Sequence, residues 1–199
     1  MREKSKVISF PHMGNYYIPA KYLFSKVFNH EVMEPKKITN RTIELGTKYS
    51  PEFVCIPFKY TLGCLIESLE SGANILLQLG GGCRYGYYSE LQEQILKDLG
   101  YDFKMINFIT CGKVNLKRIK KLLKEIDENY SRFKLFYFGI ITVKMIKYMD
   151  ELEDFIRKNI GFEVEKNSFR SLEEKMHKDF LKVNNLLSLF LMYRKYKRK

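Results

Sequence analysis

The sequence lacks long apolar segments. Its longest apolar runs, 135–143 (LFYFGIITV) and 186–193 (LLSLFLMY), are far shorter than the roughly 20 residues that span a bilayer. The charged N-terminus (MREKSKVISF) also lacks the apolar core of a signal peptide. We therefore expect a cytoplasmic protein with no transmembrane segment.

The sequence also lacks the compact motifs of several enzyme and metal-site classes. It contains no HExxH, no GxSxG and no recognisable pair of catalytic carboxylates, so a hydrolase is not supported. Its four cysteines, Cys55, Cys64, Cys83 and Cys111, form no CxxC pair. Disulfides are rare in the cytoplasm, so we expect free thiols, core residues or metal ligands. Cys64 lies inside a predicted helix and is expected in the core.

Positive charge is in excess, but it is unevenly distributed. The formal net charge is +12, of which +2 belongs to residues 1–112 and +10 to residues 113–199. Basic surfaces attract nucleic acids, yet the sequence has no helix-turn-helix, zinc-finger or RNP-type motif. We therefore interpret the charge as a solvated basic face and expect no nucleic-acid partner.

Residues 1–112 alternate short apolar runs with helical patterns. Strands are predicted at 7–10, 31–33, 74–79 and 103–109, with a brief extended piece at 53–55. Helices are predicted at 15–28, 39–48, 60–69 and 87–99, the last with an apolar face of Tyr88, Leu91, Ile95 and Leu99. This alternation predicts an α/β core with a Rossmann-like, open and mostly parallel sheet that carries helices on both faces.

Residues 113–199 are predicted to be the remainder of the same domain and mostly helical. Apolar residues at helical spacing are Leu116, Ile119, Leu123 and Ile126, then Met145, Met149, Leu152, Ile156 and Ile160. The run 135–143 fits either a strand or a buried helix. Ser171-x-x-Glu174 predicts a capping box that opens a basic C-terminal helix running to about Tyr193.

The stretch GGGCRYG places Cys83 between the strand 74–79 and the helix that begins near residue 87. Ligands of open parallel sheets bind at the carboxyl ends of strands. Glycines such as Gly81 and Gly82 let backbone N–H groups approach a ligand closely. A helix N-terminus stabilises a thiolate, which is the form that binds metal. The alternatives are a glycine-rich turn with a buried cysteine, a redox thiol, or a phosphate loop, although the usual nucleotide-loop spacings are missing.

Other residues could reach the same rim of the sheet. Cys55 ends the extended piece 53–55, and Cys111 follows the strand 103–109, which makes it a candidate third ligand. Two thiolates complete neither a tetrahedral zinc site nor a cubane cluster. His12 follows the first strand and could face this rim, whereas His30 and His177 are expected at the surface.

Three stretches together resemble a known family. They are FPHMGNYY (10–17), ITNRTIELGTKYSPEFVCIPFKYTLG (38–63) and IESLESGANILLQLGGGCRYGYYSELQEQILKDLGYDF (66–103). They resemble iron–sulfur proteins of the 2-hydroxyacyl-CoA dehydratase and benzoyl-CoA reductase superfamily, specifically the acyl-CoA dehydratase activase-related group. The resemblance covers about residues 7–107.

The resemblance implies an iron–sulfur cluster at the centre of a two-domain α/β protein. Relatives carry a 4Fe-4S or double-cubane cluster and move single electrons at low potential, supplied by an ATP-hydrolysing activator. Carried over by motif, Cys55 and Cys83 are cluster ligands. Gly81 and Gly82 let the backbone approach the cluster, and Arg84 lies near it.

The sequence also departs from this family. Relatives continue into a second α/β domain that supplies a further cysteine ligand. We expect this sequence to be the first half only, completed by a second domain, a sister subunit or a homodimer partner. Cys64 stands where relatives carry another residue, and Cys111 has no counterpart. The resemblance implies a cluster-binding domain for low-potential electron transfer or accessory redox chemistry related to ATP-coupled acyl-CoA dehydration or reduction. The alternatives are a cluster-free subunit-interaction module and phosphate or nucleotide binding at residues 80–86.

Overall fold

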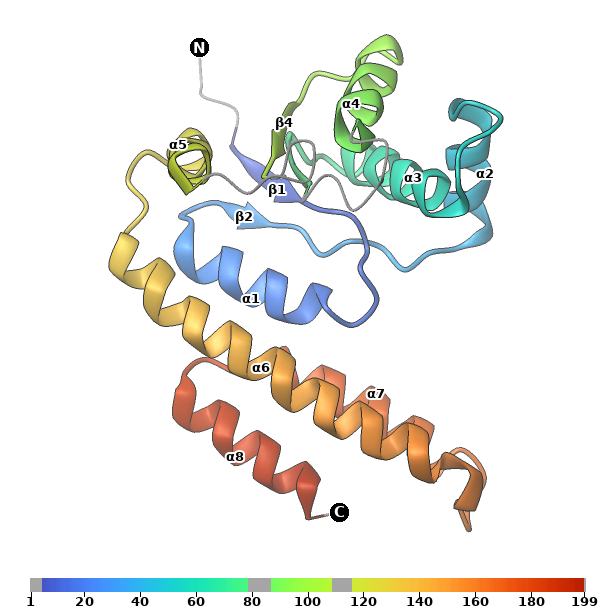
Figure 1. Cartoon of the computed structure of the whole chain (residues 1–199), viewed down its shortest axis with the longest axis vertical. Helices are drawn as coiled ribbons and strands as arrows, with labels where there is room; N and C mark the ends of the chain where they lie inside the picture. Colours follow the sequence, from blue (N-terminus) through green and yellow to red (C-terminus); the bar gives the residue numbers. More distant parts are fainter. Residues whose placement is uncertain (1–4, 79–86, 109–115, 199) are drawn as a thin grey trace. The chain divides into compact units, whose positions relative to one another are not determined.

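The computed structural model describes residues 5–78, 87–108 and 116–198 (Figure 1). The chain divides into two compact units. The sheet unit comprises Met1–Met13 and Phe28–Tyr130, and the helical unit comprises Gly14–Val27 and Ser131–Lys199.

The sheet unit is built on four parallel strands in the order β2-β1-β3-β4 (Figure 1). They are β1 (Val7–Ser9), β2 (Glu31–Val32), β3 (Ile75–Gln78) and β4 (Lys104–Asn107). The predicted α/β class is confirmed. All four residues of β3 are buried, as expected of an apolar strand inside a parallel sheet. β3 and β4 end at the same point along the sheet, since their last residues, Gln78 and Asn107, are paired.

Helices α3 and α4 pack against β3. The helices of the sheet unit are α2 (Asn40–Tyr49), α3 (Ile56–Glu70), α4 (Tyr88–Asp98) and α5 (Leu116–Ile126). A shared core joins α3 and α4 to Ala73 and Leu76 through Phe58, Leu62, Leu65, Ile66, Leu69 and Leu96. On α5, Leu123 and Ile126 are buried, as the apolar spacing predicted.

Two sequence predictions in this unit are wrong. The segment 53–55 is a turn followed by the N-cap of α3, and it contributes no strand to the sheet. Pro57 lies in the first turn of α3, where its missing N–H costs nothing. The second, the apolar face of α4, is wrong in part: Tyr88, Ile95 and Leu99 pack against the core, but Leu91 is exposed and the fully buried residues are Ser89, Gln92 and Leu96.

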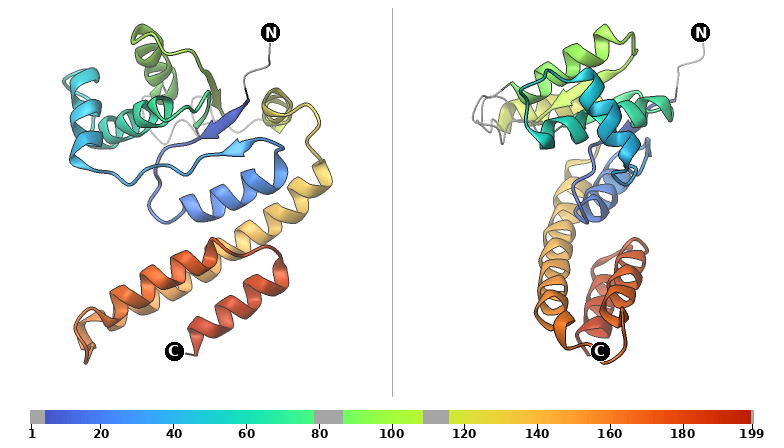
Figure 2. Two further views of the ribbon diagram at one scale, coloured as in Figure 1. Left: turned by 180° about the vertical axis from the view of Figure 1, so that it is seen from behind. Right: turned by 90° about the vertical axis from the view of Figure 1, so that its right-hand side faces the viewer.

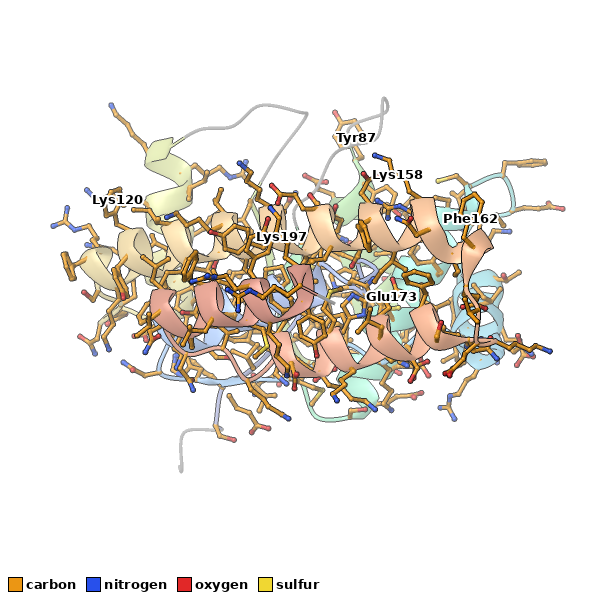
Figure 3. The ribbon with its side chains drawn as sticks, turned by 90° about the horizontal axis from the view of Figure 1, so that it is seen from below. Tyr87, Lys120, Lys158, Phe162, Glu173 and Lys197 are labelled. Atoms are coloured by element: carbon orange, nitrogen blue, oxygen red, sulfur yellow. The ribbon has the colours of Figure 1, made fainter. Side chains whose placement is uncertain are left out.

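The helical unit combines α1 with the C-terminal helices. Its elements are α1 (Tyr17–Val27), α6 (Arg132–Asn159), η1 (Ile160–Phe162), α7 (Ser168–Phe180) and α8 (Leu186–Lys197). Helices α6, α7 and α8 lie side by side (Figures 2 and 3). Their core includes Ile18 and Tyr22 of α1, Met145 and Met149 of α6, and Phe180 of α7. The ambiguous run 135–143 is therefore helical.

The predicted capping box at Ser171 and Glu174 is wrong. Helix α7 begins at Ser168, so Ser171 lies inside it, and its N-cap Asn167 adopts a left-handed conformation (φ 65°). The predicted single helix is also broken after Phe180. A new helix starts at Asn185, whose side chain accepts a hydrogen bond from Ser188 N at 2.8 Å.

Within the described ranges, none of the helices is both long and apolar enough to cross a membrane. Helix α6 is 28 residues long, but charged residues interrupt it.

Asp179 ties α7 to α8. Its Oδ2 accepts hydrogen bonds from Lys195 Nζ and Tyr196 Oη, both at 2.7 Å. The hydrogen bond from Lys195, followed by that from Tyr196, lowers the pKa of Asp179 from 3.8 to about 2. A carboxyl group with a lowered pKa stabilises the fold fully above its unfolded pKa, and this contribution is lost as the pH falls through the folded pKa.

Asp179→Asn is therefore expected to lower the free energy of unfolding by about 1 kcal/mol at neutral pH, because Lys195 is exposed and its pairing is screened. The difference from the wild type should shrink towards zero between about pH 4 and pH 2. Urea denaturation over this pH range measures it. Asp154→Asn is the matched control, since Asp154 pairs with Lys158 on an exposed surface and should change stability little. A difference that stays constant down to pH 2 would contradict the linkage.

Candidate functional site

Cys55 is a free, exposed thiol at the N-terminus of α3. Its backbone is extended (φ −68°, ψ 156°), and its carbonyl oxygen accepts hydrogen bonds from Phe58 N at 3.0 Å and Lys59 N at 3.3 Å. The unpaired N–H groups at a helix N-terminus favour negatively charged groups nearby. The thiol therefore lies where a thiolate ligand is best accommodated.

Cysteine is an unusual residue at the N-cap of a helix, the position that Cys55 takes in α3. An N-cap is normally serine, threonine, aspartate or asparagine, whose side chain accepts a hydrogen bond from the first turn. Cys55 has N-cap backbone geometry but makes no such side-chain hydrogen bond. Positions that break a local rule without a gain in stability are candidates for function.

An apolar pocket of about 420 Å³ opens beside this thiol. Its lining comes from the segment before α3, from α3 and from the start of α4, and consists of Phe53, Val54, Cys55, Phe58, Tyr87, Tyr88 and Leu91. The rings of Phe58 and Tyr88 meet edge to face at 5.1 Å and form its inner wall. Phe53 and Tyr87 are largely exposed, at 97% and 67%. Among the described residues, the pocket offers one sulfur ligand, Cys55, in apolar surroundings.

Buried amides hold the starts of α3 and α4 at the carboxyl end of β3. Gln78 Nε2 donates to Gln92 Oε1 at 2.9 Å, and Gln92 Nε2 donates to the Phe58 carbonyl at 3.4 Å. Gln92 is completely buried, which explains why α4 turns this side chain inward. Beside it, Asn107 Nδ2 donates to Glu90 Oε1, while Asn107 Oδ1 is buried and accepts no hydrogen bond from the described residues.

Cys64 lies in the core, as predicted, and is 2% exposed. Burial raises the pKa of its thiol, against the lowering effect of a hydrogen bond from the backbone of His12. His12 is half-buried, and its pKa is lowered by burial and by the nearby charge of Lys37. His12 follows β1 but does not line the pocket beside Cys55.

The remaining predicted site residues lie outside the described ranges. They are Gly81, Gly82, Cys83, Arg84 and Cys111. The segment 79–86 connects β3 to α4, and the segment 109–115 connects β4 to α5. Their predicted roles stay predictions.

Comparisons with known proteins assign this chain to no family. No family model, no curated protein and no solved structure matches the sequence or the fold. The arguments for function therefore come from the residues themselves.

Sequence reasoning missed one group of metal-ligating side chains. Glu153 of α6 and Glu173 and His177 of α7 bring their ligand atoms within 4.8 Å of one another. His177 is thus not the surface residue that we expected, since its side chain is only 14% exposed. The spacing Glu173-x-x-x-His177 was a signal in the sequence, because residues four apart share one face of a helix.

Proposed function

We propose that this chain is an iron–sulfur-cluster-binding domain that serves low-potential electron transfer or accessory redox chemistry. Cys55 and Cys83 supply thiolate ligands in this proposal. The observation that carries it is Cys55, an exposed thiol at a helix N-terminus beside an apolar pocket, whose side chain makes no capping hydrogen bond.

The position of the chain around the pocket supports pairing Cys55 with Cys83. Tyr87 lines the same pocket as Cys55, and Cys83 precedes Tyr87 by only four residues. Cys83 and Cys111 follow β3 and β4, which are neighbours and end level. This arrangement favours the proposal that further ligands come from the same edge of the sheet.

The available residues suit a cluster better than a closed zinc site. Clusters take sulfur ligands, and their potential depends on burial and on hydrogen bonds to sulfur. Apolar and aromatic side chains line the pocket, and the glycines Gly81 and Gly82 would leave space for a bulky group. Arg84 would add a positive charge beside it. When bound, such a cluster supplies one-electron transfer.

Two thiolates leave the ligand set incomplete. We propose that Cys111, a second α/β domain, a sister subunit or a second copy of this chain completes it, and that an ATP-hydrolysing activator delivers the electrons. The finer fold assignment belongs to the same proposal, namely a Rossmann-like sheet with helices on both faces. The order of the four parallel strands supports it.

Anaerobic reconstitution with ferrous iron and sulfide tests this proposal. The wild-type chain is expected to take up iron and sulfide and to develop a broad visible absorbance. Cys55→Ser should lose most of the bound iron and yet raise the free energy of unfolding by about 0.5–1 kcal/mol, because serine is a better N-cap than cysteine. Iron analysis after reconstitution measures the first effect, and thermal unfolding of the two cluster-free proteins measures the second.

Cys64→Ala is the matched control, since it removes a thiol that lies in the core and should leave the bound iron unchanged. A wild-type chain that stays colourless, or a Cys55→Ser chain that keeps its iron, would overturn the cluster proposal. The alternative function, a subunit-interaction module without a cluster, would then be favoured. Stabilisation by added ATP, but not by iron and sulfide, would favour nucleotide binding at residues 80–86.

A further inference from the structure

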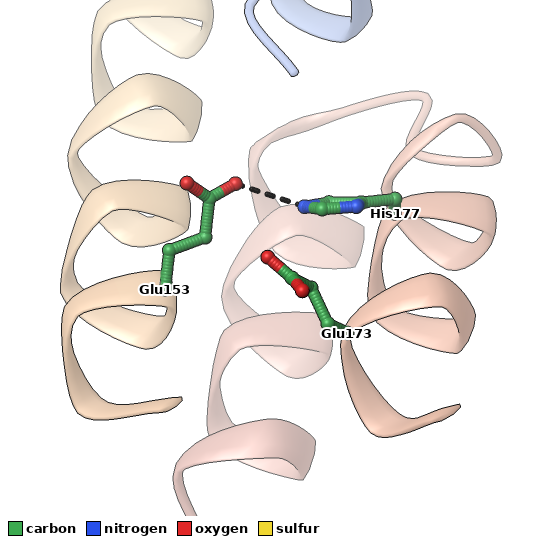
Figure 4. Close-up of side chains that lie close together, drawn as sticks. All are labelled: Glu153, Glu173 and His177. Carbon is green, nitrogen blue, oxygen red and sulfur yellow. Dashed lines mark hydrogen bonds and ion pairs between the residues drawn. The ribbon is translucent and has the colours of Figure 1, made fainter. Parts of the chain in front are cut away.

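Three ligand-type side chains converge between α6 and α7 in the helical unit (Figure 4). His177 Nε2 lies 2.8 Å from Glu153 Oε1, and Glu173 lies one helical turn before His177. All three residues are partly buried. The ligand atoms lie within 4.8 Å of one another, so small side-chain rotations bring them to the ~3.4 Å separation of ligands around a tetrahedral ion with bonds of about 2.1 Å.

The orientation of Glu153 is fixed from two sides. Asn15, two residues before α1, donates from Nδ2 to Glu153 Oε1 at 3.0 Å, on the same oxygen that faces His177. Arg157 approaches the other carboxylate oxygen only to 3.7 Å. The contacts of Oε1 with His177 and Asn15 hold the Glu153 carboxylate facing the other two side chains.

The pair between His177 and Glu153 does not account for the position of Glu173 beside it. The Glu173 carboxylate forms no hydrogen bond or ion pair within the described part of the chain, although it is partly buried and faces both His177 and Glu153 (Figure 4). The adjacent Glu174, by contrast, is exposed and pairs with Arg170 at 3.6 Å. Two neighbouring carboxylates repel each other; Arg157 reaches only the far oxygen of Glu153, and no cationic side chain among the described residues forms an ion pair with Glu173. A divalent cation would neutralise both.

The ligand types select the kind of ion. Mg²⁺ and Ca²⁺ prefer sites made of oxygen ligands alone. Imidazole together with carboxylates suits zinc and other first-row divalent metals. Three protein ligands leave a fourth position of a tetrahedral site for water or another small ligand.

We propose that Glu153, Glu173 and His177 form a zinc-class divalent metal site that joins α6 to α7. This site is separate from Cys55 and does not depend on the cluster proposal. Asn15 acts on it as a positioning residue through Glu153.

Calorimetric titration of Zn²⁺ into the full chain tests the site. The chain carries Cys55→Ser, Cys83→Ser and Cys111→Ser, so that these thiols do not compete for the metal, and Cys64 is buried in the core. We expect saturable one-to-one binding, a thermal midpoint that rises with the zinc concentration, and no comparable response to Mg²⁺. Co²⁺ is expected to bind without the thiolate-to-metal absorption that a cysteine ligand produces.

Glu173→Gln discriminates a metal site from a simple pair between His177 and Glu153. It keeps the shape of the side chain and removes one ligand, so the affinity for zinc should fall at least ~10-fold. Glu174→Gln is the matched control on the same helix and should leave the affinity unchanged. The proposal is overturned if the background chain shows no saturable zinc binding, or if the two glutamine variants weaken binding equally. Either failure would leave the cluster proposal untouched.

Discussion

Gly63→Ala is expected to lower the free energy of unfolding by about 3 kcal/mol. Gly63 lies where α3 crosses α2, and a Cβ atom added there would overlap the carbonyl oxygen of Thr42. The contact is reciprocal, since a Cβ on Gly46 of α2 would overlap the carbonyl oxygen of Lys59 on α3. Backbone atoms cannot rotate away as a flexible side chain can, so the two helices would have to separate.

The matched control for this prediction is Gly139→Ala. Gly139 lies in α6, where nothing lies within 4 Å of an added Cβ atom. Alanine is the better helix former there, so this variant should raise the free energy of unfolding by about 0.5–1 kcal/mol. Thermal and urea denaturation should show a lower free energy of unfolding for Gly63→Ala and a higher one for Gly139→Ala. Equal effects of the two substitutions would contradict the tight crossing of α2 and α3.

Thr42→Val is expected to lower the free energy of unfolding by about 2–3 kcal/mol. Thr42 is completely buried, and its hydroxyl donates to Glu67 Oε2 at 2.7 Å. The same hydroxyl accepts a hydrogen bond from Thr39 N at 3.0 Å as part of the capping box of α2. Valine has nearly the same shape but no hydroxyl, so Glu67 Oε2 and Thr39 N both lose a hydrogen-bond partner. This loss is costly because the Glu67 side chain is only 7% exposed.

A double-mutant cycle tests the pairing of Thr42 with Glu67. Thr42→Val combined with Glu67→Met replaces both partners with apolar groups, so the double variant should be more stable than Thr42→Val alone. Arg41 keeps its stronger partner Glu70, at 2.8 Å, in every variant. Urea denaturation of the four proteins gives the coupling energy. If the two effects were simply additive, the buried hydrogen bond would not be the cause.

The local patterns of the sequence predicted most of the secondary structure. The apolar strands 75–78 and 104–107 and the helices α2 and α5 lie where hydrophobic spacing placed them. The errors arose where polar groups decide the structure. Helix α4 buries Ser89 and Gln92 in place of its exposed Leu91, because the Gln92 amide pairs with Gln78 and the Phe58 carbonyl. Hydrophobic periodicity contains no information about such a hydrogen bond.

The break between α7 and α8 shows a signal that was present but overlooked. Asn185 and Ser188 have the spacing of a capping box, with a reciprocal hydrogen bond from Asn185 N to Ser188 Oγ at 3.0 Å. The apolar run that follows appeared to continue the preceding helix. A strong cap in the middle of a helical pattern therefore predicts a new helix better than the hydrophobic spacing does.

For the candidate sites, the sequence by itself determined which chemical groups are available and on which elements they lie. It identified Cys55 as a candidate ligand and Cys64 as a core residue. Only the tertiary structure decided that Cys55 begins a helix beside an aromatic pocket, and that Glu153, 24 residues before His177 in the chain, meets it across two helices. Spacing along a chain specifies the face of one helix or strand. Which faces meet depends on how distant segments pack, and this is a property of the folded chain as a whole.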